Sequence, residues 1–189
     1  WISLINQSGD IQSGSSYVLW HLRLPRLVFA LLIGATLGLS GALTQGLFRN
    51  SLADPGLLGV SAGAACAVAL GIVILNDLNL LLVPQWRFWT IPALAFSGAI
   101  LVCFALDRIA RCITPGSIAG LLLTGIALNA LAAAIIGLCT YLATDDQLRN
   151  LTFWTMGSLS GSNWFLVMAI TVLFAFAWWR LRKMVAVLN

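Results

Sequence analysis

The sequence predicts an all-α, polytopic membrane protein, and three observations support this fold class. First, 60% of the 189 residues are hydrophobic and only 8% are charged, whereas soluble domains carry about 25% charged residues. Second, charge-free stretches recur with about the 20 residues needed to cross a bilayer. Third, these stretches are apolar on all sides, whereas strands of membrane barrels alternate apolar and polar residues. A soluble helical core is excluded because the polar coat that it needs is missing.

Five charge-free stretches are expected to contain membrane-crossing helices. They cover residues 27–48, 55–76, 88–106, 112–144 and 150–179. Thr114-Pro115-Gly116 delays the fourth helix, which is therefore expected from Ile118 to Tyr141. Glycines and serines between residues 157 and 162 interrupt the fifth stretch. They predict a short helix from Gln147 to Met156 and a crossing helix from Trp164 to Trp179.

The basic residues in the loops predict which side of the membrane each end occupies. With five crossings, six Lys and Arg residues share the C-terminal side and four share the other side. Cytoplasmic loops carry the excess of Lys and Arg, so the C-terminus is predicted to be cytoplasmic. We therefore expect one membrane domain, with an external segment at residues 1–26, membrane helices at 27–179 and a cytoplasmic end at 180–189. Arg23 and Arg26 oppose the rule, and both interfacial anchoring and a specific role at the outer face remain open for them.

Small and polar residues inside the spans indicate how the helices meet. Ala30, Gly34, Gly38, Ala42 and Gly46 recur every four residues, which predicts a helix face that another backbone approaches closely. Polar groups in lipid need partners, so those of the first and fourth spans are expected to face a neighbouring helix or a water-filled path. They are Thr36, Ser40, Thr44, Gln45, Thr124, Asn129 and Thr140. For Gln45 and Asn129, helix–helix hydrogen bonding and pathway lining are both open.

Several kinds of chemistry lack the residues that they require. The cysteines at 66, 103, 112 and 139 form no Cys-x-x-Cys pair, and His21 is the only histidine, so no metal site and no cofactor are predicted. No Gly-rich loop ends in Lys-Ser or Lys-Thr, so the chain has no ATP-binding P-loop. Gly59-Val-Ser-Ala-Gly63 predicts a tightly packed helix start. Catalytic carboxylate pairs and a basic cluster for nucleic acid are absent.

Ordered motifs spread over nearly the whole chain carry more specific information. They are His21-Leu-Arg-Leu-Pro-Arg26, Gly34-Ala-Thr-Leu-Gly38, Asp54-Pro55-Gly56, Leu121-Leu-Leu-Thr-Gly125 and Phe153-Trp-Thr-Met-Gly157-Ser-Leu159. Together with their flanking residues, these motifs closely resemble the FecCD family. This family comprises the BtuC-like permease subunits of importers for iron chelates, haem and cobalamin.

The resemblance implies a permease of a binding-protein-dependent ABC importer in the inner (plasma) membrane of a bacterium. The implied partners are ATP-binding cassette ATPase subunits, a periplasmic or lipid-anchored substrate-binding protein and a second permease subunit, expected as a homodimer. ATP is hydrolysed by the separate ATPase, so the chain itself is not expected to be an enzyme. The matched motifs correspond to about the second to the sixth helix of such a permease. A chain of this extent is not expected to transport by itself.

The resemblance also assigns roles to residues of this sequence. Arg23 and Arg26 match outer arginines that pair with acidic residues of the binding protein. Such pairs would steer docking and weaken as salt rises. The cytoplasmic gate of the family falls on Ser117, Ile118, Ala119 and Gly120. Gly34, Gly38, Gln45 and Asn129 are assigned to the pathway or to helix packing.

Substrate choice is the narrowest inference from the resemblance. The segment from Asp146 to Leu159 is most similar to the haem-importing members, so haem is the expected cargo, with ferric siderophore and cobalamin as alternatives. The alternatives of another class are an ion-coupled secondary transporter and a structural membrane bundle. A secondary transporter more often carries a charged residue within a span, and the expected spans carry none.

Overall fold

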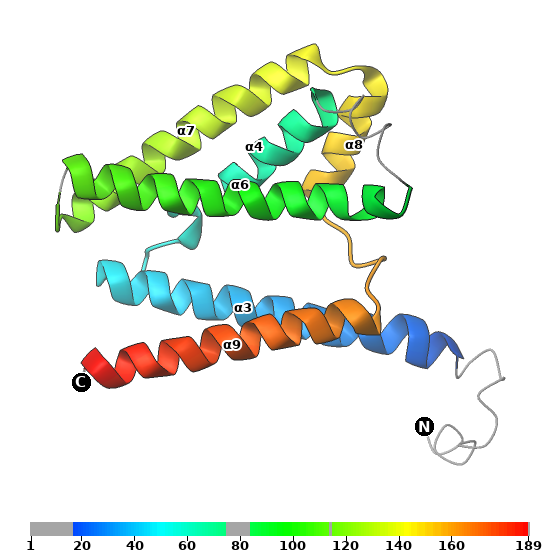
Figure 1. Cartoon of the computed structure of the whole chain (residues 1–189), viewed down its shortest axis with the longest axis horizontal. Helices are drawn as coiled ribbons and strands as arrows, with labels where there is room; N and C mark the ends of the chain where they lie inside the picture. Colours follow the sequence, from blue (N-terminus) through cyan, green and yellow to red (C-terminus); the bar gives the residue numbers. More distant parts are fainter. Residues whose placement is uncertain (1–16, 75–83, 114, 189) are drawn as a thin grey trace. The chain divides into compact units, whose positions relative to one another are not determined.

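The computed structural model describes residues 17–74, 84–113 and 115–188, and this part of the chain contains helices and turns but no strand (Figure 1). A π-helix (Val18–Arg23) runs directly into α3 (Leu24–Phe48), and a 3-10 helix (Pro55–Leu58) precedes α4 (Val60–Val73). There follow α6 (Pro84–Ile113), α7 (Ile118–Leu142), α8 (Asp145–Met156) and α9 (Trp164–Leu188). The predicted all-α fold is confirmed. Residues 1–40 and 158–189 form one compact unit, and residues 41–157 form a second one.

Four helical segments of the described chain are long and apolar enough to cross a membrane: Val18–Phe48, Trp89–Ile113, Ile118–Leu142 and Trp164–Lys183. The helix α4 is also apolar but has only 14 residues, which is about 21 Å at 1.5 Å per residue. It occupies the second expected span, residues 55–76. That span is shortened because Pro55–Leu58 forms a 3-10 helix and Gly59 then takes a left-handed conformation with φ 80°. Leu75 and Asn76 of the expected span lie outside the described residues.

The observed helix ends differ most from the expected ones where charges were used to set the boundary. The first helical segment begins at Val18 rather than Leu27, so Arg23 and Arg26 lie within it; residues 1–16 of the expected external segment lie outside the described residues. Helix α6 continues past Leu106 to Ile113, and α9 continues past Trp179 to Leu188. Helices extend beyond the apolar core because charged side chains at their ends reach water. The helices expected at 118–141 and 147–156 are found at Ile118–Leu142 and Asp145–Met156.

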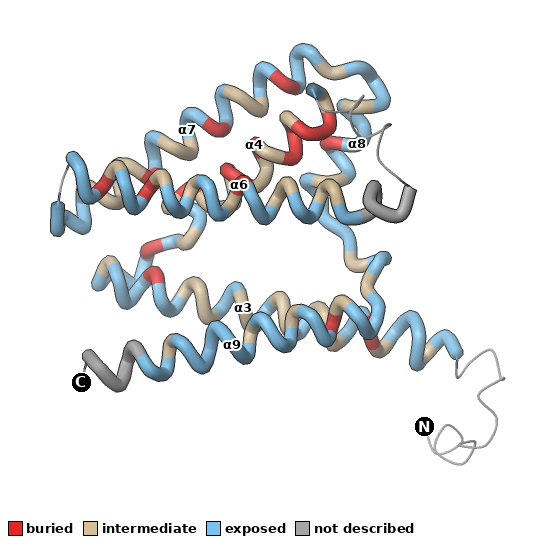
Figure 2. Tube along the Cα trace, viewed as in Figure 1, coloured by how far each residue is buried: buried red, intermediate tan, exposed pale blue. Residues whose placement is uncertain are grey.

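The core of the second unit forms around the short helix α4. Val68 and Ala69 are fully buried there and cluster with Ile72, with Cys139 of α7 and with Leu151 of α8 (Figure 2). Helices α6 and α7 pack along α4 and α8 contacts it as well. A helix that is apolar on all sides is suited to this central place. The sequence therefore gives the shortest apolar helix the most enclosed position in this unit.

Helix α8 is fixed at its start by its own sequence and by α4. The Thr144 hydroxyl accepts from the backbone N–H of Gln147, and the Gln147 side chain accepts from the backbone N–H of Thr144 at 3.0 Å, which together form a capping box. The Gln147 amide also donates to the carbonyl of Val73 at 3.4 Å. The end of α4 and the start of α8 are therefore joined by a hydrogen bond.

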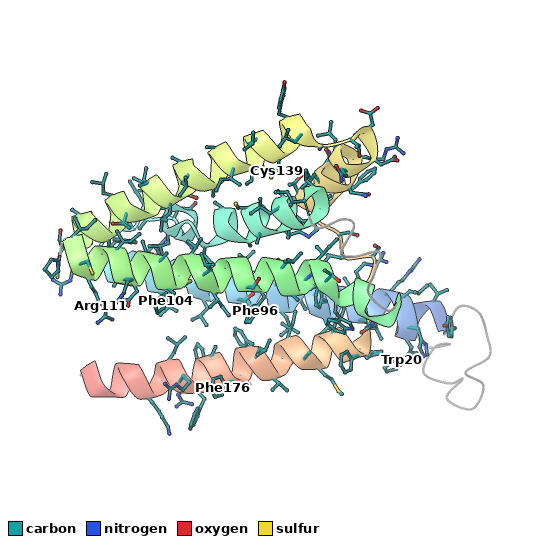
Figure 3. The ribbon with its side chains drawn as sticks, turned by 45° about the horizontal axis from the view of Figure 1, so that its top comes forward. Trp20, Phe96, Phe104, Arg111, Cys139 and Phe176 are labelled. Carbon is teal, nitrogen blue, oxygen red and sulfur yellow. The ribbon has the colours of Figure 1, made fainter. Side chains whose placement is uncertain are left out.

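In the first unit, the described residues are mostly exposed. The two buried ones are Pro25, early in α3, and Val167, in the first turn of α9. The Trp164 indole N–H donates to the carbonyl of Trp20 at 2.9 Å, which joins the start of α9 to the π-helix. Large apolar side chains such as Leu31 of α3 and Phe176 of α9 are exposed (Figure 3). This is the surface expected of helices that face lipid.

Candidate functional site

The first candidate site is the arginine pair at the start of the first long helical segment. Arg23 is the last residue of the π-helix, Arg26 lies in the first turn of α3, and both are exposed. Residues three apart on a helix share one side of it. The described part of this unit contains no acidic residue. The pair therefore forms a small basic surface with no neutralising carboxylate in the described part of its own unit.

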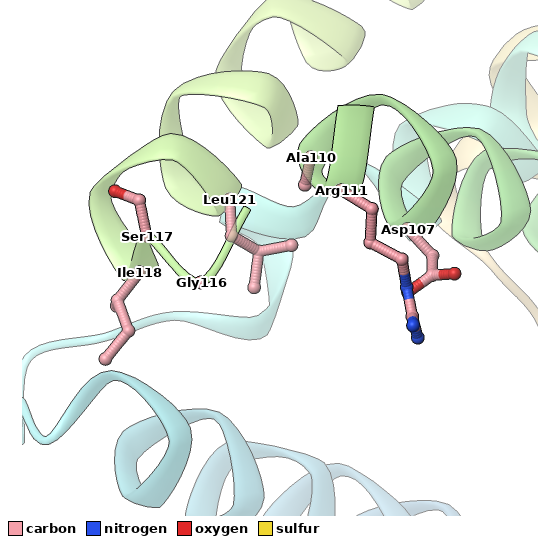
Figure 4. A pocket seen from close by; sticks show the side chains of 7 residues that line it. All are labelled: Asp107, Ala110, Arg111, Gly116, Ser117, Ile118 and Leu121. Carbon is pink, nitrogen blue, oxygen red and sulfur yellow. The ribbon is translucent and has the colours of Figure 1, made fainter. Parts of the chain in front are cut away.

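The second candidate site is the segment before α7, where a gate is expected. Gly116 has φ 76°, and the Ser117 hydroxyl caps α7 by accepting from the backbone N–H of Gly120 at 3.1 Å. Ser117 and Ile118 line a pocket of about 200 Å³ together with residues at the end of α6 (Figure 4). Ala119 is exposed and Gly120 is half-buried. Ser117 therefore caps the start of α7, and Ile118, a large apolar residue that is exposed, follows it in the first turn of the helix.

An exposed ion pair lies on the α6 side of the same pocket. The Arg111 guanidinium donates to the Asp107 carboxylate at 2.7 Å, one helical turn apart, and Figure 4 shows both side chains at the rim. Exposed pairs of this kind contribute only about 0.3–0.5 kcal/mol to stability. The pocket is lined by the polar residues Asp107, Arg111 and Ser117 and by the apolar residues Ala110, Ile118 and Leu121.

The predicted glycine face of α3 is open, and the close helix contacts are made by other glycines. A Cβ added to Gly34 or Gly38 would meet no atom within 4 Å among the described residues of its unit. A Cβ added to Gly98 of α6 would instead lie 2.5 Å from the carbonyl oxygen of Gly63 in α4. The interpretation of Gly59-Val-Ser-Ala-Gly63 as a tightly packed helix start is confirmed. The contact partner Gly98 was missed because it is a single glycine without a repeat.

The Pro55–Leu58 turn packs against one face of α7. A Cβ on Gly125 would collide with the carbonyl oxygen of Leu57. One turn further along α7, the Asn129 amide donates to the carbonyl of Gly56 at 2.9 Å and to that of Leu57 at 3.4 Å. Asn129 therefore hydrogen-bonds to the short 3-10 helix Pro55–Leu58. Gln45 is exposed near the end of α3.

Hydroxyl groups inside the spans find their partners within their own helices. Thr36 donates to the carbonyl of Ile33 at 2.8 Å, and Thr124 and Thr140 donate to carbonyls four residues earlier at 2.8 and 2.7 Å. These three hydroxyls already have a hydrogen-bond partner in their own helix, and their expected position facing a neighbouring helix or a water-filled path stays a prediction. Threonine reaches a carbonyl of the preceding turn, which is already available in any helix.

The chemistry of the described residues is that of a helical scaffold. Cys66, Cys103, Cys112 and Cys139 are all free thiols. The described residues contain no group of three or more His, Cys, Asp and Glu side chains that could hold a metal ion. An apolar pocket of about 260 Å³ lies between α4, α6 and α7 and is lined by Gly63, Cys66, Leu101, Leu131 and their neighbours. It offers shape and apolar surface rather than reactive groups.

The long apolar helices, the buried short helix and the apolar exposed surface define a multi-pass α-helical membrane protein. The model of the FecCD transport family matches residues 1–188. The chain therefore belongs to the FecCD transport family, and the resemblance noted in its motifs is confirmed.

Individual relatives show how far the likeness extends. The chain is 43% identical over 150 residues to the hemin transport system permease protein HmuU of Yersinia pestis, covering 77% of this chain and 43% of that protein. It is 41% identical over 150 residues to the vitamin B12 import system permease protein BtuC of Klebsiella pneumoniae, covering 77% and 41%. The chain thus spans less than half the length of these relatives.

A solved structure has a similar fold. It is described as an inward-facing conformation of an ABC transporter of metal-chelate type, and it matches with a TM-score of 0.67 and 30% identity. The match covers 89% of this chain and 51% of the other one. The similarity to an ABC transporter therefore holds for the arrangement of helices as well as for the sequence.

Proposed function

We propose that the chain forms part of the membrane-spanning permease of a binding-protein-dependent ABC importer. The observation that carries the proposal is the match to the FecCD transport family over residues 1–188, joined to at least four apolar helices of spanning length. The complex would lie in the inner membrane of a bacterium. ATP hydrolysis would belong to separate ATPase subunits, and the permease would pair with a second copy.

Haem is the proposed cargo, with cobalamin and ferric siderophore as its competitors. The segment from Asp146 to Leu159, which contains α8, supports haem through its likeness to haem-importing members. The chain is 43% identical to a hemin permease and 41% identical to a vitamin B12 permease, and this small difference in identity does not distinguish the two cargoes. All three cargoes are bulky chelates, and a path with few charges suits each of them.

Within this function, Arg23 and Arg26 would form the docking site for the binding protein. Their exposure and the lack of acidic residues in the described part of their unit support this role. The segment Ser117–Gly120 would form the cytoplasmic gate. The turn at Gly116, the Ser117 cap and the pocket that they line support this second role.

The test is an uptake experiment with the complete gene product. The permease is co-produced with its ATPase, reconstituted in liposomes and supplied with haem, cobalamin or a ferric siderophore on the matching binding protein. We expect ATP-dependent uptake, fastest for haem. Faster uptake of another chelate would reject haem as the cargo but not the importer function. Uptake driven by an ion gradient without ATP, or no uptake while the ATPase is bound, would reject the importer.

A further inference from the structure

One side of α9, near its C-terminal end, carries a compact group of aromatic and basic side chains. The members are spaced three and four residues apart, which places them on the same side of the helix. They are Phe176, Trp179, Arg180 and Lys183. All four are exposed. We call this group the aromatic-basic patch.

The side chains of the patch contact one another in an order that runs from apolar to charged. The ring centroids of Phe176 and Trp179 lie 6.1 Å apart. The Lys183 ammonium lies 3.8 Å from the centre of the Trp179 ring, which is within the range of a cation–π interaction. A lysine side chain is otherwise a flexible chain of four carbons. The Trp179 ring therefore gives the Lys183 charge a defined place.

The length of α9 sets the depth of the patch in the membrane. The apolar segment from Trp164 to Lys183 has 20 residues, or about 30 Å at 1.5 Å per residue, and the hydrocarbon core of a bilayer is about as thick. The Trp164 indole N–H donates to the Trp20 carbonyl at 2.9 Å, so α9 begins beside the start of the first long helical segment. Arg180 and Lys183 then reach the headgroups at the opposite boundary, which the charge pattern predicts to be the cytoplasmic one.

The charges of the patch have no carboxylate partner in the described part of their own unit. Residues 17–40 and 158–188 contain neither Asp nor Glu. Arg and Lys form strong, charge-assisted hydrogen bonds with phosphate groups. Leu173, three residues before Phe176, is also exposed and continues the patch as apolar surface (Figure 3). Two cations at headgroup depth above apolar side chains match a phospholipid, which has a phosphate above its acyl chains.

We propose that the aromatic-basic patch binds the headgroup of an anionic phospholipid. Arg180 and Lys183 donate to the phosphate, and Trp179 and Phe176 lie against the glycerol and the upper part of an acyl chain. A zwitterionic headgroup brings a cation of its own, which the two basic side chains repel, so the net negative lipid is preferred. The proposal depends on the membrane position of α9 but not on the importer function. The patch lies at the opposite end of α9 from Trp164 and is separate from the proposed docking site.

The experiment measures phospholipid binding to the complete gene product in complex with its ATPase. The purified complex is titrated in detergent with phosphatidylglycerol or with phosphatidylcholine, and native mass spectrometry gives the Kd for each lipid. The second readout is hydrogen exchange of the peptide covering residues 172–183. It is measured in nanodiscs of phosphatidylcholine with and without phosphatidylglycerol.

Two matched pairs of variants separate the patch from its surroundings. Arg180→Gln with Lys183→Gln removes the two cations, and Arg182→Gln with Arg108→Gln removes two other exposed cations that are predicted to lie on the same side of the membrane. Arg182 is about 160° around the helix from Arg180, at 100° per residue. Trp179→Leu removes the ring beneath Lys183. Trp178→Leu is its control, because the two tryptophans are 51% and 48% exposed.

We expect the unaltered complex to bind phosphatidylglycerol more tightly than phosphatidylcholine. Arg180→Gln with Lys183→Gln should weaken phosphatidylglycerol binding about tenfold to thirtyfold, since each basic residue near an anionic surface contributes roughly fivefold, and should speed exchange in the peptide. Trp179→Leu should weaken it about twofold to fivefold. The control variants and the binding of phosphatidylcholine should change little. Equal losses in the two charge variants would show a general attraction to negative lipid and overturn the proposal.

A protein partner at the same surface would give a different result. If Arg180→Gln with Lys183→Gln releases the ATPase without changing lipid binding, the patch is a protein contact and the proposal is wrong. A lack of preference for phosphatidylglycerol in the unaltered complex would also overturn it. Arg180→Lys with Lys183→Arg keeps both charges and should keep phosphatidylglycerol binding. Weak binding by this variant as well would reject recognition by charge.

Discussion

Gly63 and Gly98 bring the backbones of α4 and α6 into direct contact. A Cβ added to Gly98 would lie 2.5 Å from the carbonyl oxygen of Gly63 and equally close to the Cβ of Ala67. Both obstacles belong to α4, and one is backbone, so neither can move aside as a long side chain would. The close approach is what allows the short helix α4 to be enclosed by its neighbours.

Gly98→Ala should therefore destabilise the second unit. Forcing one methyl group into this contact separates α4 from α6, and overpacking of this kind costs about 1–3 kcal/mol. SDS-induced unfolding of the purified complete protein, followed by circular dichroism, measures the effect. Gly137→Ala is the matched control, because a Cβ there meets nothing within 4 Å among the described residues. A loss as large in the control as in Gly98→Ala would contradict the packing explanation.

Asn129→Asp should loosen the turn at Pro55–Leu58. The substitution keeps the shape but replaces the donor that serves the carbonyls of Gly56 and Leu57 with a carboxylate, which repels them. The expected cost at neutral pH is about 1–3 kcal/mol. Hydrogen exchange of the peptide covering residues 52–60 measures the loosening.

Asn129→Leu removes the amide without adding a charge, so it should loosen the same peptide less than Asn129→Asp does. Exchange in Asn129→Asp that equals exchange in the unaltered protein would count against the hydrogen bonds.

Arg23→Glu with Arg26→Glu should slow association of the binding protein with the complete complex. Reversing two exposed charges changes mainly the association rate and its salt dependence, and we expect a loss of about tenfold or more at low ionic strength. Stopped-flow association over a salt series measures it. The difference from the unaltered complex should shrink as salt rises. Reversal of Arg180 and Arg182, which lie at the other end of α9 in the same unit, is the control and should leave association unchanged.

Ser117→Cys should report opening and closing of the proposed gate. In a complex whose exposed Cys103 and Cys112 are replaced by Ala, oxidative cross-linking between two permeases should change several-fold between the nucleotide-free and nucleotide-trapped states. Leu138→Cys, exposed near the other end of α7, is the control. The same cross-linking yield in both states would reject movement at Ser117.

Sequence reasoning located most helices because their signals are local. Thr114-Pro115-Gly116 predicts the start of α7 at Ile118, where it is found, and Gly157 marks the end of α8. The boundaries taken from charge were less accurate. Arg26, Asp107 and Arg180 ended the expected spans, but the helices continue through them. Charge limits the depth of a residue in the membrane rather than its backbone conformation.

The candidate site was only partly accessible to the sequence. Arg23 and Arg26 stand in a motif of the family and Ser117 shortly precedes another one, so their positions could be named in advance. Gly125 and Gly98 could not, because a glycine that receives a neighbouring backbone looks the same in the sequence as Gly137, which receives none. Asn129 was left between two roles for a similar reason: its amide can bond to any carbonyl that the fold brings near.

The sequence by itself determined that the chain lies in a membrane, that its fold is all-α and that it belongs to its family. Composition, the length of charge-free stretches and ordered motifs depend only on residues close together in the chain. Tertiary structure decided which surfaces meet. It placed the short helix α4 in the core, set the Pro55–Leu58 turn on Gly125 and Asn129, and brought the indole N–H of Trp164 to the carbonyl of Trp20. These relationships join residues tens of positions apart or more. Lipid solvates all apolar helix surfaces about equally well. Close packing and hydrogen bonding therefore decide which helix packs against which.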